Sequence, residues 1–197
     1  MGNNTDHIKN IERITLSKEW ATLNRIDYDY EFKDGRVKRV SRESYDRGDG
    51  CAILLYNREK RTLILTRQFR MPIYQNDHTE SMSIEVCAGA IDKNESPKVT
   101  IIREVEEEVG YRILDAELVQ EAYMSPGALT EKLYLYLAPY DESMKVNAGG
   151  GVATEDEDIE VMEMSFDDAI TMIKNKQIVD AKTIMLIQYA RLNEVLM

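Results

Sequence analysis

The stretch GAIDKNESPKVTIIREVEEEVGY, residues 89–111, carries the most specific pattern in the chain. Pro97 suits the first turn of a helix and Gly110 suits the position just past a helix end, so the pattern predicts a helix from Pro97 to Val109. Acidic residues fill the second half of this helix, and their spacing indicates what the helix can bind.

Three glutamates gather on one face of the predicted helix. With about 100° of rotation per residue, Glu104 and Glu108 lie one turn apart and Glu107 lies beside them. Clustered carboxylates repel one another unless a cation lies among them, and oxygen ligands without histidine or cysteine point to Mg²⁺ or Mn²⁺. Arg103, one turn before Glu107, can hold that carboxylate in position. The sequence therefore predicts a divalent metal site on the helix.

Another side of the helix is apolar. Ile102, Val105 and Val109 fall together on a second face, which we expect to anchor the helix to a sheet. Taken alone, glutamates at this spacing more often form a solvated helix surface than a metal site. In this chain Gly89 and Glu95 precede the helix, and their presence beside the glutamates favours the metal site.

Alternating apolar and polar residues predict strands on both sides of the helix. The alternation from Thr22 to Phe32 indicates a half-buried strand, and Asp34-Gly35 predicts a hairpin turn into a return strand at 36–45. Further strands are predicted at 51–57, 62–69, 83–87, 113–123, 130–138 and 159–164, and further helices at 166–175 and 181–195. This order predicts an α+β fold, with an N-terminal β-hairpin subdomain at 1–45 and the main domain at 46–197.

Composition excludes several classes of protein. With 25 Lys and Arg against 36 Asp and Glu, the formal net charge is −11, which argues against a duplex-DNA binder. A small anionic ligand stays compatible, because a metal ion or a local arginine cluster reverses the sign of charge inside one site. Cys51 and Cys87 lie in apolar runs and are expected to be buried free thiols. With no membrane span and no signal-peptide core, we expect a cytoplasmic protein that binds neither membrane nor nucleic acid.

The 89–111 stretch resembles the Nudix box, G-x5-E-x7-R-E-U-x-E-E-x-G-U with U apolar. All fixed identities match, from Gly89 through Glu95 to Gly110, and Tyr111 stands at the last apolar position. Four outer segments resemble the GDP-mannose pyrophosphatase branch of the Nudix hydrolases, close to the ADP-ribose pyrophosphatases: residues 45–48, 67–70, 123–127 and 147–151. The resemblance implies an α/β/α sandwich with a mixed sheet, in which residues 46–197 form the catalytic domain.

The resemblance also implies a set of site residues. The Ala88 carbonyl, Glu104, Glu108 and Glu157 would bind the metal, with Mg²⁺ expected and Mn²⁺ possible. The catalytic residues would be Arg103, Glu107, Glu108 and Glu131. Substrate contacts would come from Trp20, Ser41, Arg42, Glu43, Arg70, Ala88, Gly89, Ala90, Glu108, Glu131, Asp156, Glu157 and Lys182. We interpret Gly149–Gly151 as a hinge for the acidic loop that follows.

The implied reaction is hydrolysis of GDP-mannose to GMP and mannose 1-phosphate by a homodimer that associates through the N-terminal subdomain. Four candidates stay open for the general base, with Glu131 preferred: Glu107, Glu108, Glu131 and Glu157. Hydrolysis of ADP-ribose to AMP and ribose 5-phosphate is the main alternative. A non-catalytic module that binds nucleotide sugars is less favoured because every box glutamate is present. A Ca²⁺-binding protein is disfavoured because the D-x-D-x-D-G loop is absent from the sequence.

Overall fold

The computed structural model describes residues 7–151 and 158–196, and it divides into two compact units. The first unit comprises Met1–Asp49 with Tyr123–Lys132, and the second comprises Gly50–Ala122 with Leu133–Met197. The segment Tyr123–Lys132 therefore belongs with the N-terminal residues, although it lies far from them in the sequence. None of the described helices is both long and apolar enough to span a membrane.

The second unit is built on a mixed sheet. Its main path runs in the order β10 (Glu160–Ser165), β5 (Thr62–Phe69), β4 (Gly50–Asn57), β9 (Lys132–Pro139) and β8 (Glu117–Tyr123). Two short strands complete it: β6 (Met82–Glu85) pairs with β5, and β7 (Cys87–Ala90) pairs with β4. The β4–β9 pair is parallel, whereas β4 pairs with β5 and with β7 in the antiparallel sense.

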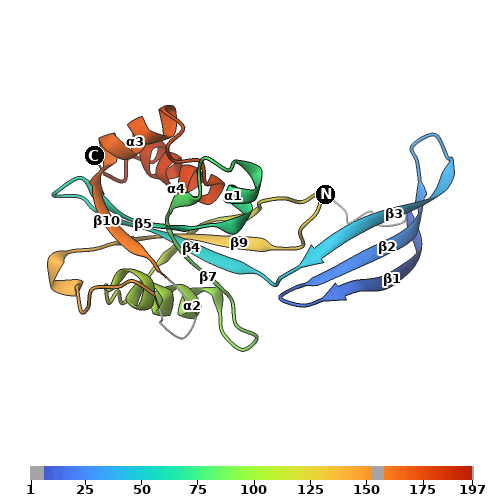
Figure 1. Cartoon of the computed structure of the whole chain (residues 1–197), viewed down its shortest axis with the longest axis horizontal. Coiled ribbons are helices and arrows are strands. Elements are labelled where there is room, and N and C mark those ends of the chain that lie inside the picture. The colour runs from blue at the N-terminus through green and yellow to red at the C-terminus, as the bar shows by residue number, and fades with distance from the viewer. Residues whose placement is uncertain (1–6, 152–157, 197) are drawn as a thin grey trace. The chain divides into compact units, whose positions relative to one another are not determined.

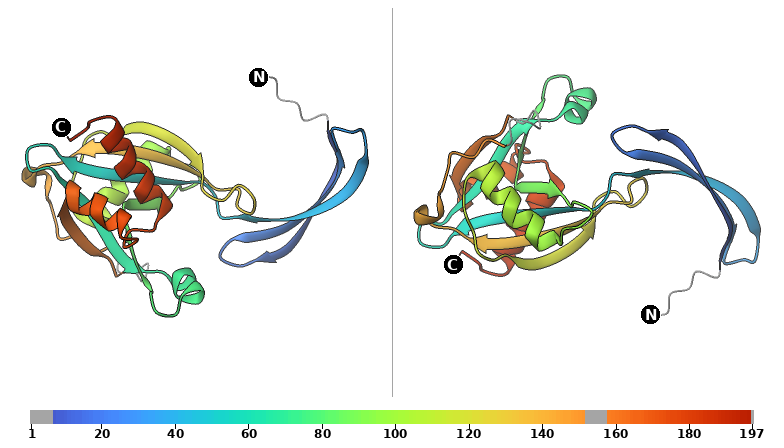
Figure 2. Two further views of the ribbon diagram at one scale, coloured as in Figure 1. Left: turned by 90° about the horizontal axis from the view of Figure 1, so that it is seen from above. Right: turned by 90° about the horizontal axis from the view of Figure 1, so that it is seen from below.

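Helices cover both faces of this sheet, as Figures 1 and 2 show. One face carries α3 (Phe166–Lys174) and α4 (Ala181–Leu192). The other carries α2 (Pro97–Glu104), which continues without a break into the π-helical turn η1 (Val105–Val109). A short helix α1 (Met71–Asn76) joins β5 to β6, and a 3-10 turn η2 (Glu142–Met144) follows β9. The predicted α+β fold and α/β/α sandwich are confirmed.

The core explains why the motif helix lies on the sheet. Residues 51–55 of the central strand β4 are all buried, as expected for a strand covered on both faces. Alternate residues of that strand, Cys51, Ile53 and Leu55, belong to one buried cluster with Ile101, Val105 and Val109. The expected anchors Val105 and Val109 are thus confirmed. Ile102 is only partly buried, and Ile101 takes the fully buried place.

The first unit contains a three-stranded antiparallel sheet in the order β1 (Ile8–Lys18), β2 (Thr22–Glu31) and β3 (Val37–Asp46). The predicted hairpin is confirmed, with Gly35 at φ 82° in the turn that Asp34 stabilises by accepting from the Arg36 amide at 3.1 Å. Strand β1 was not predicted. Register shifts between Lys9 and Glu12 and between Thr15 and Ser17 interrupt its alternation.

Other boundaries also differ from the sequence-based expectation. The predicted strand at 83–87 is two strands, because β6 ends at Glu85 on β5 and β7 begins at Cys87 on β4. The helix α1 was missed, since six residues are too few to show helical periodicity. The predicted helix over 97–109 changes to π-helical geometry at Val105. Inserted π turns are frequent at functional sites, and this one carries Glu107 and Glu108, two of the four fixed glutamates of the pattern.

Candidate active site

The motif helix is fixed at both ends by its own sequence. At the start, the Ser96 hydroxyl accepts a hydrogen bond from the Val99 amide at 3.4 Å, and Pro97 occupies the first turn. At the end, Gly110 adopts a left-handed conformation with φ 78°. These caps set where the glutamates lie along the sheet.

Arg103 is surrounded by carboxylates of the motif. Its guanidinium lies 2.6 Å from Glu107, 3.1 Å from Glu104 and 3.5 Å from Glu95. Desolvation opposes the charge of Arg103, but Glu104 and the hydrogen bond to Glu107 outweigh it and raise the arginine pKa. Arg103 therefore stays cationic and holds Glu104 and Glu107 in fixed orientations, as the spacing predicted for Glu107.

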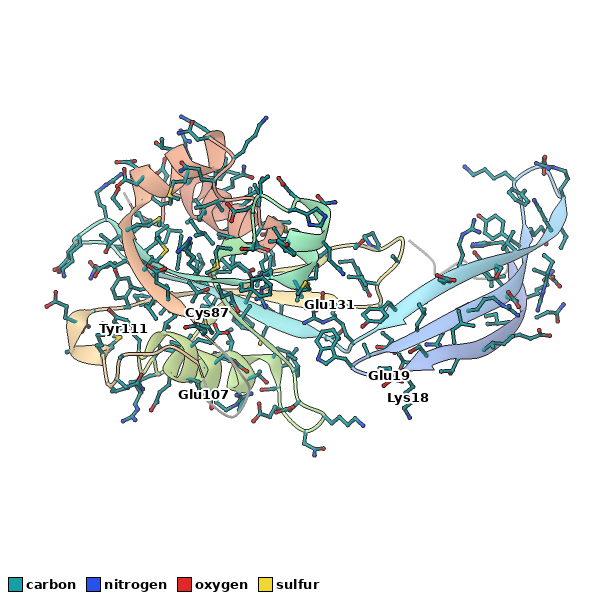
Figure 3. All side chains as sticks on the ribbon, in the orientation of Figure 1. Lys18, Glu19, Cys87, Glu107, Tyr111 and Glu131 are labelled. Atoms are coloured by element: carbon teal, nitrogen blue, oxygen red, sulfur yellow. The ribbon has the colours of Figure 1, made fainter. Side chains whose placement is uncertain are left out.

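Glu108 is a buried carboxylate, with 3% of the residue exposed. One of its oxygens accepts from the Ala88 amide at 3.2 Å, which brings strand β7 against the helix. The Cys87 thiol also bonds to Glu108, and burial raises the pKa of that thiol far above its usual range. Both cysteines are buried and unpaired, as predicted. Figure 3 marks Glu107 on η1 and Cys87 in the neighbouring strand.

Gly89 is required by the closeness of Glu104. A Cβ atom at this position would lie 2.3 Å from Cδ of Glu104, so any side chain would displace that carboxylate. The glycine of the motif thus lets the backbone that carries the Ala88 carbonyl approach the glutamates.

The donors at this place are all oxygen atoms. The carboxylates of Glu104 and Glu108 both lie against strand β7, and oxygen donors of this kind suit a hard divalent cation. The Ala88 carbonyl stays a predicted ligand. Within residues 7–151 and 158–196, no three acidic, histidine or cysteine side chains converge into a complete metal cluster. The predicted fourth ligand Glu157 and the predicted substrate contact Asp156 lie outside the described residues.

The glycines after η2 are tied to the end of the motif helix. The amides of Gly150 and Gly151 donate to the carbonyls of Glu108 and Glu107 at 2.9 and 3.3 Å. At Gly149, with φ 70°, a Cβ would lie 2.6 Å from the Glu108 carbonyl oxygen. These glycines therefore allow a close backbone contact with the motif helix and help satisfy its last carbonyls.

A second polar cluster lies beside the motif and includes two predicted substrate contacts, Arg70 and Lys182. The guanidinium of Arg70 donates to both oxygens of Glu85, at 2.9 and 3.0 Å. The ammonium of Lys182 donates to Glu85 at 2.6 Å and to Asp180 at 2.9 Å. The structure thus brings together residues 70 and 182, which are far apart in the sequence, on one carboxylate that the sequence analysis missed.

Of the remaining predicted residues, Ala90 ends strand β7 of the second unit, and the others lie in the first unit. Glu131, 8% exposed, is 3.2 Å from Nε of Arg47, and the Arg47 guanidinium lies 5.0 Å from the centre of the Trp20 ring. The triplet Ser41–Glu43 lies on β3, and Ser41 and Glu43 share a face that excludes Arg42. All three of these residues are exposed. Ser41 also forms a hydrogen bond that lowers the pKa of Asp27 on the adjacent strand.

A cavity of about 790 Å³ lies elsewhere in the second unit, next to α1, β5, β6 and the α3–α4 connection. Its lining includes Arg67, Ile84, Met172 and Val179, and the candidate active-site residues are not part of it. Because it lacks the motif carboxylates, this cavity is not the place where the motif chemistry occurs.

Comparison with known proteins decides the family. A model described as the NUDIX domain matches residues 46–187, which is more than half of the chain. The chain belongs to the Nudix family. A second model, described as the GDP-mannose pyrophosphatase NudK N-terminal domain, matches residues 7–45. The carboxylates on α2 and η1 are therefore those of the Nudix box, and the chain is an enzyme of the Nudix hydrolase class.

Two relatives are similar over almost their whole length. A GDP-mannose pyrophosphatase from Pectobacterium atrosepticum is 51% identical over 180 residues, which cover 91% of this chain and 92% of the relative. A GDP-mannose pyrophosphatase from Escherichia coli is 44% identical over 192 residues, which cover 98% of this chain and 99% of the relative. The crystal structure of an ADP compounds hydrolase shares the fold, with a TM-score of 0.68 and 21% sequence identity. The match covers 93% of this chain and 91% of the hydrolase. Nudix hydrolases require divalent metal ions, in keeping with the oxygen donors on this helix.

Sequence reasoning missed Glu85, Asp180 and Arg47. A signal existed for Glu85, because a charged residue inside the apolar run at 83–87 is unusual for a buried strand. Asp180 precedes a predicted helix, where it was open to interpretation as a cap only. Arg47 lay within a segment already quoted for the resemblance but carried no role of its own.

Proposed function

We propose that this Nudix hydrolase cleaves the pyrophosphate bond of GDP-mannose, giving GMP and mannose 1-phosphate. The observation that carries the proposal is the pair of relatives named GDP-mannose pyrophosphatase, at 51% and 44% identity over 91% and 98% of this chain. The N-terminal match at residues 7–45 supports the same substrate. The β-strand unit that would contact the nucleoside is thus shared along with the box.

Glu104, Glu108 and the Ala88 carbonyl would hold the metal ion, for which we propose Mg²⁺, together with Glu157. When bound, such an ion neutralises charge on the diphosphate and lowers the pKa of a coordinated water. Arg103 keeps Glu104 and Glu107 in place through its bonds at 3.1 and 2.6 Å. Arg70 and Lys182 would bind the phosphate oxygens, and the N-terminal residues Trp20 and 41–43 would contact the guanosine.

The base that takes the proton from the attacking water is proposed to be Glu131. Its carboxylate is nearly buried and is oriented by Arg47 at 3.2 Å, which is the kind of fixed geometry that proton transfer needs. Glu107, Glu108 and Glu157 are the other candidates. Replacement of Glu131 by Gln is expected to lower kcat by at least about 10²-fold. Near-normal turnover in that variant would move the role to one of the box glutamates or to Glu157.

The first unit supports a homodimer. Among its described residues, Ala21 is the one apolar residue that is buried. Strand pairing places Ile8, Tyr28, Tyr30 and Val40 on one face of the sheet, so this face has an apolar character without a core of its own. We propose that it packs on a second copy of the chain. A monomeric mass by light scattering at working concentration would contradict this.

The test of the function is phosphate release in the presence of Mg²⁺ and alkaline phosphatase, with GDP-mannose and ADP-ribose compared. Neither substrate yields phosphate until its pyrophosphate bond is cut, because the phosphatase attacks terminal phosphates only. A preference for GDP-mannose that is lost in Glu108→Gln supports both the substrate and the metal site. A preference for ADP-ribose would keep the chemistry and overturn the sugar nucleotide. Inertness toward both would favour the non-catalytic binding module.

The cytoplasm is the proposed compartment of this enzyme. Cys51 and Cys87 are both buried and unpaired, which suits a reducing environment.

A further inference from the structure

The cluster around Glu85 contains two cations, Arg70 and Lys182, and two anions, Glu85 and Asp180, which differ in exposure. The Glu85 side chain is 5% exposed, whereas that of Lys182 is 14% exposed and that of Arg70 is 41% exposed. Glu85 lies at the end of β6, and Lys182 lies in the first turn of α4. The Glu85 carboxylate contacts both Lys182 and Arg70. Asp180, which is bonded to Lys182, is 19% exposed, so the guanidinium of Arg70 is the charged group of this cluster that meets solvent most.

The two cations are oriented as well as neutralised. Arg70 uses Nε and Nη2 for Glu85, so the bidentate pair fixes the plane of the guanidinium and does not use Nη1. Lys182 is fixed from two sides, by Glu85 at 2.6 Å and by Asp180 at 2.9 Å. Asp180 is itself held by the amide and hydroxyl of Thr183, at 2.9 and 2.6 Å.

The cluster is also connected to the strand that carries the metal-binding backbone. The Val86 amide, next to Glu85, donates to the Thr183 hydroxyl at 2.8 Å. Two residues beyond Val86 is Ala88, whose amide donates to Glu108. The charge of Glu108 is among those that raise the pKa of Arg70, after the hydrogen bond and charge of Glu85. The cations and the Nudix box thus act on the same region of the second unit.

We propose that Glu85 is a positioning residue that holds Arg70 and Lys182 as a two-cation subsite for the phosphate oxygens of the diphosphate substrate. The inference rests on the proposed function, since it assigns the anion that these two cations receive. Glu85 does not touch the substrate. It acts by keeping Arg70 and Lys182 in one geometry before the substrate arrives, which removes an ordering cost from binding.

A purely structural role makes a different prediction. Removing one partner of a buried ion pair destabilises a protein wherever the pair lies, and this loss does not depend on the substrate. A positioning role requires that the effect of Glu85 on substrate pass through the cations. The two roles are separated by asking whether the effect of changing Glu85 survives when Arg70 is already absent.

The experiment is a double-mutant cycle with Glu85→Gln, Arg70→Ala and the double variant, with kcat and KM measured for GDP-mannose in Mg²⁺. Glu85→Gln is expected to lower kcat/KM by about tenfold or more, mainly through KM, when Arg70 is present. In the Arg70→Ala background the same change should cost about threefold or less, since only Lys182 is left to be positioned. Equal losses in both backgrounds would overturn the inference.

A matched control is Glu160→Gln, which removes the exposed Glu160–Arg67 pair at 3.1 Å. Arg67 lies on β5, the strand after which Arg70 follows. This variant should keep kcat/KM within about twofold of the unaltered enzyme. Glu85→Asp retains the charge with a shorter reach and should fall between the unaltered enzyme and Glu85→Gln. Glu85→Asp keeps the test decisive if Glu85→Gln does not fold. A folded Glu85→Asp variant that is no more active than Arg70→Ala would count against positioning. Activity equal to that of the unaltered enzyme would also count against it.

Binding of inorganic pyrophosphate with Mg²⁺, measured by titration calorimetry on the same variants, separates the inference from the proposed function. If the unaltered chain does not hydrolyse GDP-mannose, the proposed function fails, and the calorimetry still decides the role of Glu85. Pyrophosphate binding weakened about tenfold in Glu85→Gln, but little in the Arg70→Ala background, supports the subsite. Unchanged binding in Glu85→Gln would overturn it even if GDP-mannose were cleaved.

Discussion

The two units of this protein differ in how their side chains are supported. The second unit buries a continuous core between its sheet and helices, in which Ile53, Ile101 and Val105 are fully enclosed. Among the described residues of the first unit, only Ala21 of the apolar side chains is buried, and large residues such as Ile11 remain 64% exposed. The second unit therefore has the means to be stable by itself, whereas a three-stranded sheet without a covered face is marginal.

The same difference appears in the candidate site residues. Glu85 and Glu108 of the second unit are each 3% exposed and are held by cations or backbone amides. Trp20 of the first unit is 74% exposed and is in contact with Arg47 on one ring face. The box glutamates thus lie on a buried core, while Trp20 and residues 41–43, which are proposed to recognise the nucleoside, are exposed. Glu131, the proposed base, is the exception, because it belongs to the first unit and is only 8% exposed. Chemistry needs fixed geometry, and recognition tolerates more variation.

The largest expected effect is loss of Glu108, the carboxylate of the second unit that is proposed to bind the metal. Glu108→Gln should lower kcat by about 10³-fold or more, because a neutral amide is a poor ligand for a hard divalent cation. The measurement is phosphate release from GDP-mannose at saturating Mg²⁺. Circular dichroism of the variant should match the unaltered chain. Activity within about tenfold of normal would mean that Glu108 does not bind the metal.

The next largest effect compares packing in the two units directly. Ile101→Ala should lower the free energy of unfolding by about 2–5 kcal/mol, since it leaves a cavity in a fully enclosed core. Ile11→Ala, at a residue that is 64% exposed, should cost about 0.5 kcal/mol or less. Urea unfolding followed by circular dichroism gives both values. Similar losses at the two positions would show that the first unit has a core after all, for example one formed by association.

A third effect is the pH dependence of stability in the core unit. Burial alone would raise the pKa of Glu85, but the hydrogen bond from Arg70 and the charge of Lys182 lower it from 4.5 to about 2. A carboxyl group whose pKa is lower in the folded state adds stability above its unfolded pKa. That contribution is then lost as the pH falls from about 4.5 toward 2, on the order of 1–3 kcal/mol in total.

This pH dependence is measured by urea unfolding at a series of pH values. Between pH 4.5 and 2, the free energy of unfolding of Glu85→Gln should fall less steeply with decreasing pH than that of the unaltered chain, because the Glu85 carboxyl is absent. The Glu160→Gln variant is the control and should keep the slope of the unaltered chain. Identical slopes in the unaltered chain and in Glu85→Gln would mean that Glu85 is not bound to the two cations in solution.

The smallest expected effect concerns recognition by the first unit. Trp20→Ala should raise KM for GDP-mannose by about tenfold with little change in kcat, the range expected for a lost base–aromatic stack. Trp20→Phe, which keeps a ring, should restore most of the affinity. A fall in kcat with unchanged KM would place Trp20 in the chemical step and would contradict its proposed role in recognising the guanosine.

Most of the catalytic helix could be predicted because its determinants are local. Pro97 and Gly110 mark its ends, and the pairing of Arg103 with Glu107 follows from a separation of four residues. The π-helical turn could not be predicted from the sequence, because no residue spacing marks it. It coincides with the packing of Val105 and Val109 on the sheet, which is a tertiary contact. Strand β1 was missed for a related reason, since its two register shifts break the alternation that identifies a strand.

By itself, the sequence determined the Nudix box, the hairpin at Asp34-Gly35 and the α+β class, because each depends on residues a few positions apart. Only the tertiary structure decided that Arg70, Glu85 and Lys182 meet, and that Arg47 links Trp20 to Glu131. These partners are brought together by strand pairing and by the docking of α4 beside β6. Contacts between distant segments depend on the free energy of the whole fold, which short-range spacing does not encode.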